Sequence, residues 1–244
     1  MRILISHKVD KILSLPISYH HIIQSIIYRN LESAYGYSEY VHDKGQFLGK
    51  RNYKMFTFSS LRGKYRIEGK QLVFYDRVSF EVSSNDFLML KILGENIVAH
   101  GIRYGENCYE QVEVSYYDDT VENNAIEINM LSPICIYSTE LNGNTYFYAP
   151  YDKEFQNMIN ENFQRKYEAC YGVKPVSDIT IEAVEHNEKN KYVTKYKSIY
   201  ITGWKGKYIL KGERKYLDFL YQVGLGGKNS QGFGMFSILK EADI

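Results

Sequence analysis

Hydrophobic and polar positions follow two periods in this chain of 244 residues, and the elements they predict recur in the same order in each half. Residues 1–7 have the pattern of a strand. After Pro16, apolar residues at 19, 22, 23, 26 and 27 follow the i, i+3, i+4 spacing of a helix with one buried face. With Ser18 as its N-cap, this helix is expected to run for about 16 residues.

The remaining elements of the first half complete the order strand, helix, strands, helix, strand, which resembles a ferredoxin-like unit. The pattern predicts helices at residues 37–42 and 85–93, and strands at residues 53–61, 65–75, 77–83 and 110–117.

An acidic, polar stretch at residues 118–124 separates the halves and predicts domains at 1–120 and 121–244. We expect the class α+β, with two tandem ferredoxin-like (RRM-like) domains, each an antiparallel sheet with helices on one face, and a C-terminal glycine-rich loop. This expectation depends on element order, because no repeat is visible in the sequence itself. For the second half the pattern predicts strands at 125–139, 145–148, 178–186, 192–210 and 235–239, helices at 152–171 and 214–223, and turns at Asn142–Gly143 and Gly172.

Charge is distributed unevenly, although the net charge is only +1. Residues 44–66 carry seven basic side chains and no acid, residues 189–215 carry nine bases and one acid, and residues 106–127 carry seven acids and no base. Basic residues interleaved with tyrosines are typical of a phosphate-binding surface, and Lys205, Lys207 and Lys211 are the contacts we expect there. The alternative is a pair of solvated strand faces.

Several classes are excluded by what the chain does not contain. The three cysteines are far apart and show neither metal-ligand spacing nor a disulfide framework, which favours reduced cysteines in the cytoplasm. No apolar stretch approaches the 18 residues typical of a membrane span. We therefore expect a cytoplasmic protein without a bound metal, cofactor or membrane.

Five of the eleven residues from Gly224 to Gly234 are glycine. The spacing fits neither a phosphate-binding Walker loop nor a dinucleotide fingerprint. Glycines permit positive φ angles and close backbone approach, so successive N–H groups could form an anion-binding nest, with charge from Lys228 and donors from Asn229. A purely structural loop that closes the last hairpin is the alternative.

This loop, with its Lys-Asn-Ser-x-Gly-Phe-Gly-Met ending at Met235, resembles that of the CRISPR-associated endoribonucleases of the sixth Cas family. These enzymes belong to the repeat-associated mysterious protein (RAMP) superfamily and process precursor CRISPR RNA. Weaker similarities extend over nearly the whole chain: Tyr40–Asp43, Lys54–Ser59, Leu131–Ile134, Lys166–Tyr167 and Tyr171–Pro175.

The resemblance implies a catalytic group of Tyr28, His42 and Lys54, which match the family's Tyr, His and Lys by position. The helical period agrees for Tyr28, which lies away from the apolar stripe together with His21 and Gln24. The implied reaction is attack of the ribose 2′-OH on the adjacent phosphate without a metal, leaving 2′,3′-cyclic phosphate and 5′-OH ends. His42 would transfer protons, Tyr28 would position or deprotonate the 2′-OH, and Lys54 would stabilise the transition state.

The expected partner is CRISPR repeat RNA, as precursor crRNA, and the oligomeric state is left open between monomer and homodimer. Lys50 and Arg51 are alternative cations to Lys54, and the vicinal His20 and His21 are read as solvated. The alternative function is a non-catalytic RNA-binding scaffold subunit of a CRISPR effector complex. The expected RNA-binding residues are Lys50, Arg51, Lys205, Lys207, Lys211, Gly224, Gly226, Gly227, Lys228, Asn229, Ser230 and Gly232.

Overall fold

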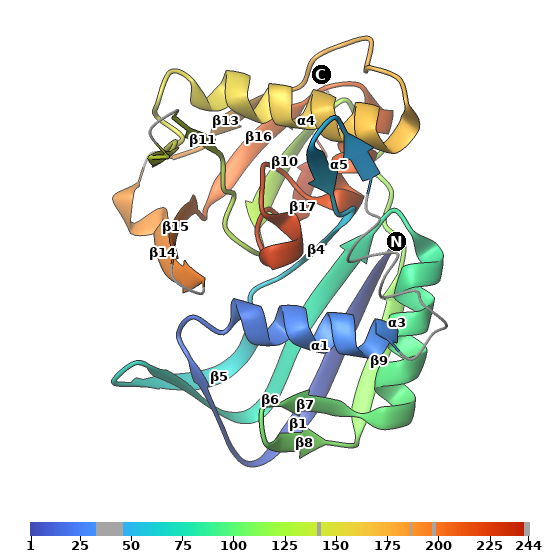
Figure 1. Ribbon diagram of the computed structural model, residues 1–244, viewed down its shortest axis with the longest axis vertical. Helices are drawn as coiled ribbons and strands as arrows, with labels where there is room; N and C mark the ends of the chain where they lie inside the picture. Colours follow the sequence, from blue (N-terminus) through green and yellow to red (C-terminus); the bar gives the residue numbers. More distant parts are fainter. Residues whose placement is uncertain (33–45, 141–142, 186, 197–198, 242–244) are drawn as a thin grey trace.

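The computed structural model describes residues 1–32, 46–140, 143–185, 187–196 and 199–241, which form two main antiparallel sheets, one above the other in Figure 1. The lower sheet has the strand order β4-β6-β1-β9, and its chain order β1-α1-β4-β6-α3-β9 is that of a ferredoxin-like unit. Its elements are β1 (Arg2–Pro16), α1 (His20–Glu32), β4 (Phe56–Phe58), β5 (Arg62–Glu68), β6 (Gln71–Ser84), α3 (Phe87–His100) and β9 (Val112–Tyr117).

The upper sheet repeats this arrangement with the order β13-β16-β10-β17. The predicted α+β class is therefore confirmed, and both sheets have ferredoxin-like connectivity. The predicted domain boundary, between residues 120 and 121, falls in the segment that connects the sheets. The elements are β10 (Ala125–Met130), α4 (Phe155–Tyr171), β13 (Thr180–Ala183), β16 (Lys207–Lys211), α5 (Arg214–Val223) and β17 (Phe236–Glu241).

Short hairpins and turns extend from the two sheets. β5 pairs with β6, and among the described residues four two-stranded pairs lie outside the main sheets. These elements are β2 (Gln46–Leu48), β3 (Arg51–Tyr53), β7 (Ile102–Tyr104), β8 (Asn107–Tyr109), β11 (Tyr137–Thr139), β12 (Thr145–Phe147), β14 (Lys191–Tyr196), β15 (Ile199–Trp204) and the 3₁₀ turns η2 (Glu188–Asn190) and η3 (Asn229–Gln231).

Each sheet has its own apolar core. In the first half, Ile23, Ile26 and Ile27 of α1 are buried against β1 and α3, as the apolar period predicts. In the second half, the buried face of α4 packs with α5 over the upper sheet. Sequence period and core therefore agree for α1.

The halves are also joined by hydrogen bonds that anchor the glycine-rich loop and α5. Thr57 Oγ1 of β4 donates to Phe233 O at 2.9 Å, and Ser60 N donates to Leu131 O at 3.0 Å. At the other side, the buried Arg2 guanidinium donates to Tyr221 O at 2.8 Å and stacks on that residue's ring. The first half therefore holds the segment 221–234 near both of its ends.

Several predicted boundaries are wrong. The stretch 192–210 is not one strand, since Gly206 has a φ of 105° between β15 and β16. The strand expected at 125–139 ends at Met130, and the first strand continues to Pro16, so α1 begins only at His20 and Ser18 is not adjacent to it. The helix predicted at 37–42 and Asn142 of the predicted turn lie outside the described residues.

Candidate active site between the two sheets

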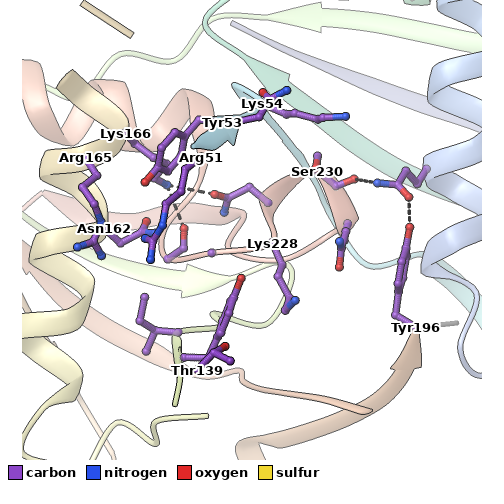
Figure 2. Close-up of a pocket in the computed structure, with 18 of the residues that line it drawn as sticks. Arg51, Tyr53, Lys54, Thr139, Asn162, Arg165, Lys166, Tyr196, Lys228 and Ser230 are labelled. Carbon is purple, nitrogen blue, oxygen red and sulfur yellow. Dashed lines mark hydrogen bonds between the residues drawn. The ribbon is translucent and has the colours of Figure 1, made fainter. Parts of the chain in front are cut away.

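A cavity of about 1080 Å³ lies between the two halves. Figure 2 shows Asn162, Arg165 and Lys166 of α4 on one side of it, with Ser230 and Tyr196 across from them. Among the described residues, five basic side chains line it and a single carboxylate, Glu161, which is paired with Arg165 at 3.1 Å. The basic residues are Arg51, Lys54, Arg165, Lys166 and Lys228. Such a surface suits a polyanion.

Tyr28 and Lys54 lie together at this cavity. Tyr28 comes from α1 and Lys54 follows β3, and the Lys54 Nζ is 5.3 Å from the centre of the Tyr28 ring. The ring also packs edge-on against Phe56, with centroids 5.9 Å apart, so Tyr28 is half-buried at the rim of the first core. The helical period correctly placed it away from the main apolar stripe.

Burial raises the pKa of the Tyr28 phenol, and a hydrogen bond with the Ser230 side chain works in the opposite direction. Because the net shift is upward from an ordinary pKa near 10, the phenol keeps its proton at neutral pH. Tyr28 is therefore suited to donate a hydrogen bond rather than to remove a proton.

The glycine-rich loop forms another wall, and most of its glycines face the protein. Gly226 and Gly232 have φ angles of 65° and 86°. A Cβ on Gly232 would lie 2.4 Å from the Phe58 ring, and one on Gly226 would lie 2.5 Å from Cys135 O. The close approach that these glycines permit is thus to β4 and to the segment before β11.

Within the loop, Asn229 serves as an internal brace. Its Nδ2 donates to Leu225 O and Phe233 O, both at 2.9 Å. Both N–H donors of this amide are therefore used within the loop. Of the predicted loop residues, Gly224 and Gly232 do not line the cavity, whereas the others do: Gly226, Gly227, Lys228, Asn229 and Ser230.

The hairpin of β14 and β15 closes one end of the cavity by contacting α1. Tyr196 donates its hydroxyl hydrogen to Gln24 Oε1, and Gln24 Nε2 donates to Ser230 O at 2.7 Å (Figure 2). Next to it, the Tyr192 ring stacks on His20 with centroids 5.7 Å apart. His20 is 2% exposed, so the expectation that it is solvated is wrong, whereas His21 does line the cavity.

A family model described as "CRISPR associated protein Cas6, C-terminal" matches residues 116–238, which is half of the chain. The chain belongs to the Cas6 family of CRISPR-associated proteins. The predicted family is confirmed.

Curated relatives agree over almost the full length. The CRISPR-associated endoribonuclease Cas6 of Pyrococcus furiosus is 26% identical over 96% of this chain and 88% of its own. The endoribonuclease Cas6 1 of Methanocaldococcus jannaschii is 27% identical over 96% of this chain and 91% of its own. The prediction of an endoribonuclease is therefore confirmed.

Solved structures share the fold. A structure described as a Cas6-related gene product from Pyrococcus furiosus has a TM-score of 0.79 at 21% identity, covering 99% of both chains. A RAMP protein described as binding different RNA substrates also has a TM-score of 0.79 at 21% identity, covering 98% of this chain and 100% of its own.

The remaining predicted site residues lie away from the cavity or outside the described residues. Lys205, Lys207 and Lys211 are exposed on β16 and the turn before it, and Lys207 is 3.9 Å from Glu127. None of the three lines the cavity, and neither does Lys50 in the turn between β2 and β3. His42 lies in the stretch 33–45, outside the described residues.

Sequence reasoning missed the basic residues of α4. Lys166 and Asn162 occupy the buried stripe of that helix, together with Phe155, Ile159 and Phe163. Polar residues at positions where the period predicts apolar ones were the available signal. Among the described residues, no three His, Cys, Asp or Glu side chains gather to hold a metal ion, and no described helix is long and apolar enough to span a membrane.

Proposed function

We propose that this chain cleaves the repeats of precursor CRISPR RNA by attack of the ribose 2′-OH on the adjacent phosphate, without a metal. The products would be a 2′,3′-cyclic phosphate and a 5′-OH. The main support is the meeting of Tyr28 and Lys54 on the wall of a basic cavity that both halves build. An intramolecular nucleophile needs positioning and charge stabilisation more than activation, because its effective concentration is already high.

The residues present suit these requirements. The protonated Tyr28 phenol would hold the 2′-OH or a phosphate oxygen in line by donating a hydrogen bond. Lys54 would stabilise the negative charge that builds up on the phosphorane. His42 would carry the proton to the departing 5′-oxygen, since imidazole titrates near neutral pH.

RNA would enter along the positive walls of the cavity. Arg51 and Arg165 lie on the α4 side of the cavity and Lys228 lies apart from them, so the three would contact successive phosphates (Figure 2). Lys205, Lys207 and Lys211 would then contact RNA only outside the cavity, on the exposed face of β16 and the turn before it.

The test is cleavage of repeat RNA in EDTA, followed on a denaturing gel. We expect cleavage by the wild type, and a loss of about 10²-fold or more in rate for His42→Ala with RNA affinity retained. His100→Ala, at the exposed end of α3, is the matched control and should cleave normally.

End-group analysis of the product tests the chemistry separately. A 2′,3′-cyclic phosphate supports 2′-OH attack, whereas a 3′-hydroxyl end would contradict it. Tight RNA binding by the wild type without any cut would instead support the scaffold subunit.

A further inference from the structure

Lys166 is buried in an unusual environment. Its side chain reaches from α4 to the glycine-rich loop and is only 3% exposed. Its Nζ donates to Gly224 O at 2.5 Å, to Asn229 Oδ1 at 3.1 Å and to Gly226 O at 3.2 Å. Three acceptors match the three protons of an ammonium group, and all three belong to one loop.

No carboxylate of the described residues forms an ion pair with Lys166. Burial without a counter-charge lowers the pKa of this amine to about 7. An apolar side chain on the buried stripe of α4 would avoid this cost. The position of Lys166 therefore points to a requirement of the loop rather than of the core.

The contacts fix two peptide units of the loop at both ends. The carbonyls of Gly224 and Gly226 accept from Lys166, while the following N–H groups, of Leu225 and Gly227, donate to Gly234 O and Cys135 O. The next residues along the chain are those that face the cavity, Lys228 and Ser230.

We propose that Lys166 is a positioning residue, which holds the glycine-rich loop so that Lys228 and Ser230 face the RNA beside Tyr28. Only the part of this inference that concerns RNA binding depends on the proposed function. The part that concerns the loop does not. Lys166 itself would not contact RNA, because it is buried and the three acceptors around its Nζ all belong to the loop.

The first test compares Lys166→Met with the wild type. We expect faster amide hydrogen exchange across residues 224–234 in the free protein, and a dissociation constant for repeat RNA about 10-fold higher, since hydrogen bonds from a charged group are lost. Lys153→Met, an exposed lysine just before α4, should change neither quantity. Unchanged exchange and affinity in Lys166→Met would overturn the proposal.

A double-mutant cycle tests whether Lys166 acts through the loop. If it does, Lys228→Met should weaken RNA binding clearly in the wild type and much less in the Lys166→Met background. Losses that simply multiply would mean that Lys166 acts independently of Lys228, and the proposal would be wrong.

If Lys166→Met does not fold, the same measurements are made on Lys166→Gln. This variant keeps two N–H donors and should give intermediate effects. A wild type that neither binds nor cleaves repeat RNA would refute the proposed function. Hydrogen exchange of the loop would still decide whether Lys166 holds it.

Discussion

His20 is a buried titratable residue where α1 meets the β14–β15 hairpin. Its ring lies between the rings of Phe233, at 5.2 Å, and Tyr192, at 5.7 Å, and its Nε2 is 3.3 Å from the Tyr192 hydroxyl. Burial lowers the pKa of His20 to about 4, while nearby Lys205 acts in the same direction. The imidazole is therefore neutral in the folded protein at physiological pH.

This pKa makes the fold sensitive to acid. Between pH 6.5 and 4, His20 binds a proton in the unfolded chain but not in the folded chain. The free energy of unfolding therefore falls as the pH is lowered. Between pH 7 and pH 5, His20 should lower the free energy of unfolding of the wild type by about 2 kcal/mol. In His20→Gln, urea unfolding should show a fall that is smaller by this amount. His100→Gln, at an exposed histidine, is the control for the substitution itself.

Single residues were predictable where one helix determines their environment. The period of α1 placed Tyr28 away from the core stripe, and its position beside Lys54 agrees with the expected group. The same reasoning failed for His20, because the residues that bury it come from β14 and the glycine-rich loop, far away in sequence.

Elements were predictable where local signals coincide with their ends. Helix α5 has the predicted bounds, Arg214–Val223, and α4 ends at Gly172 as expected. Helix α3 continues beyond the predicted Leu93 to His100, and Gly94 within it is a packing residue: a Cβ there would lie 2.1 Å from the Tyr116 hydroxyl. The sequence alone does not distinguish such a glycine from a helix stop.

The glycine-rich loop allows a steric test with a matched control. Gly232 and Gly172 both have left-handed backbone, but a Cβ on Gly172 would meet no atom within 4 Å. Gly172→Ala should cost about 1 kcal/mol from its φ angle alone. Gly232→Ala should cost about 1–3 kcal/mol more because of the overlap with Phe58, measured by thermal unfolding. Equal costs would contradict the described packing.

On the scale of the whole molecule, Arg2 connects the halves. It is 1% exposed, lies 3.7 Å from Glu81 and stacks on Tyr221 of α5, with its guanidinium 3.5 Å from the ring centre. Glu81 also pairs with Arg62 and accepts from Tyr117. A buried network of this kind is costly to break, because the remaining charge stays desolvated.

We expect Arg2→Met to lower the free energy of unfolding by about 3 kcal/mol in urea titrations. Lys64→Met removes a solvent-exposed pair with Asp76, 3.1 Å long, and should cost less than about 1 kcal/mol. A similar small loss for both variants would show that Arg2 contributes little to the junction.

The cavity itself could not be predicted from local pattern. Its walls come from α1, the segment after β3, β11, α4, β14 and the glycine-rich loop, and only the packing of the two sheets brings them together. The sequence did identify Arg51, Lys54 and Lys228, because their segments are rich in basic residues or glycine. The predicted lysines on and before β16 lie outside the cavity, and the sequence did not point to Arg165 and Lys166 of α4.

The contact of Gly232 with Phe58 has an evolutionary consequence. Because the ring fills the space that a side chain at position 232 would need, neither position can change freely without the other. We expect the two sites to covary among relatives, with any larger residue at 232 accompanied by a smaller one at 58.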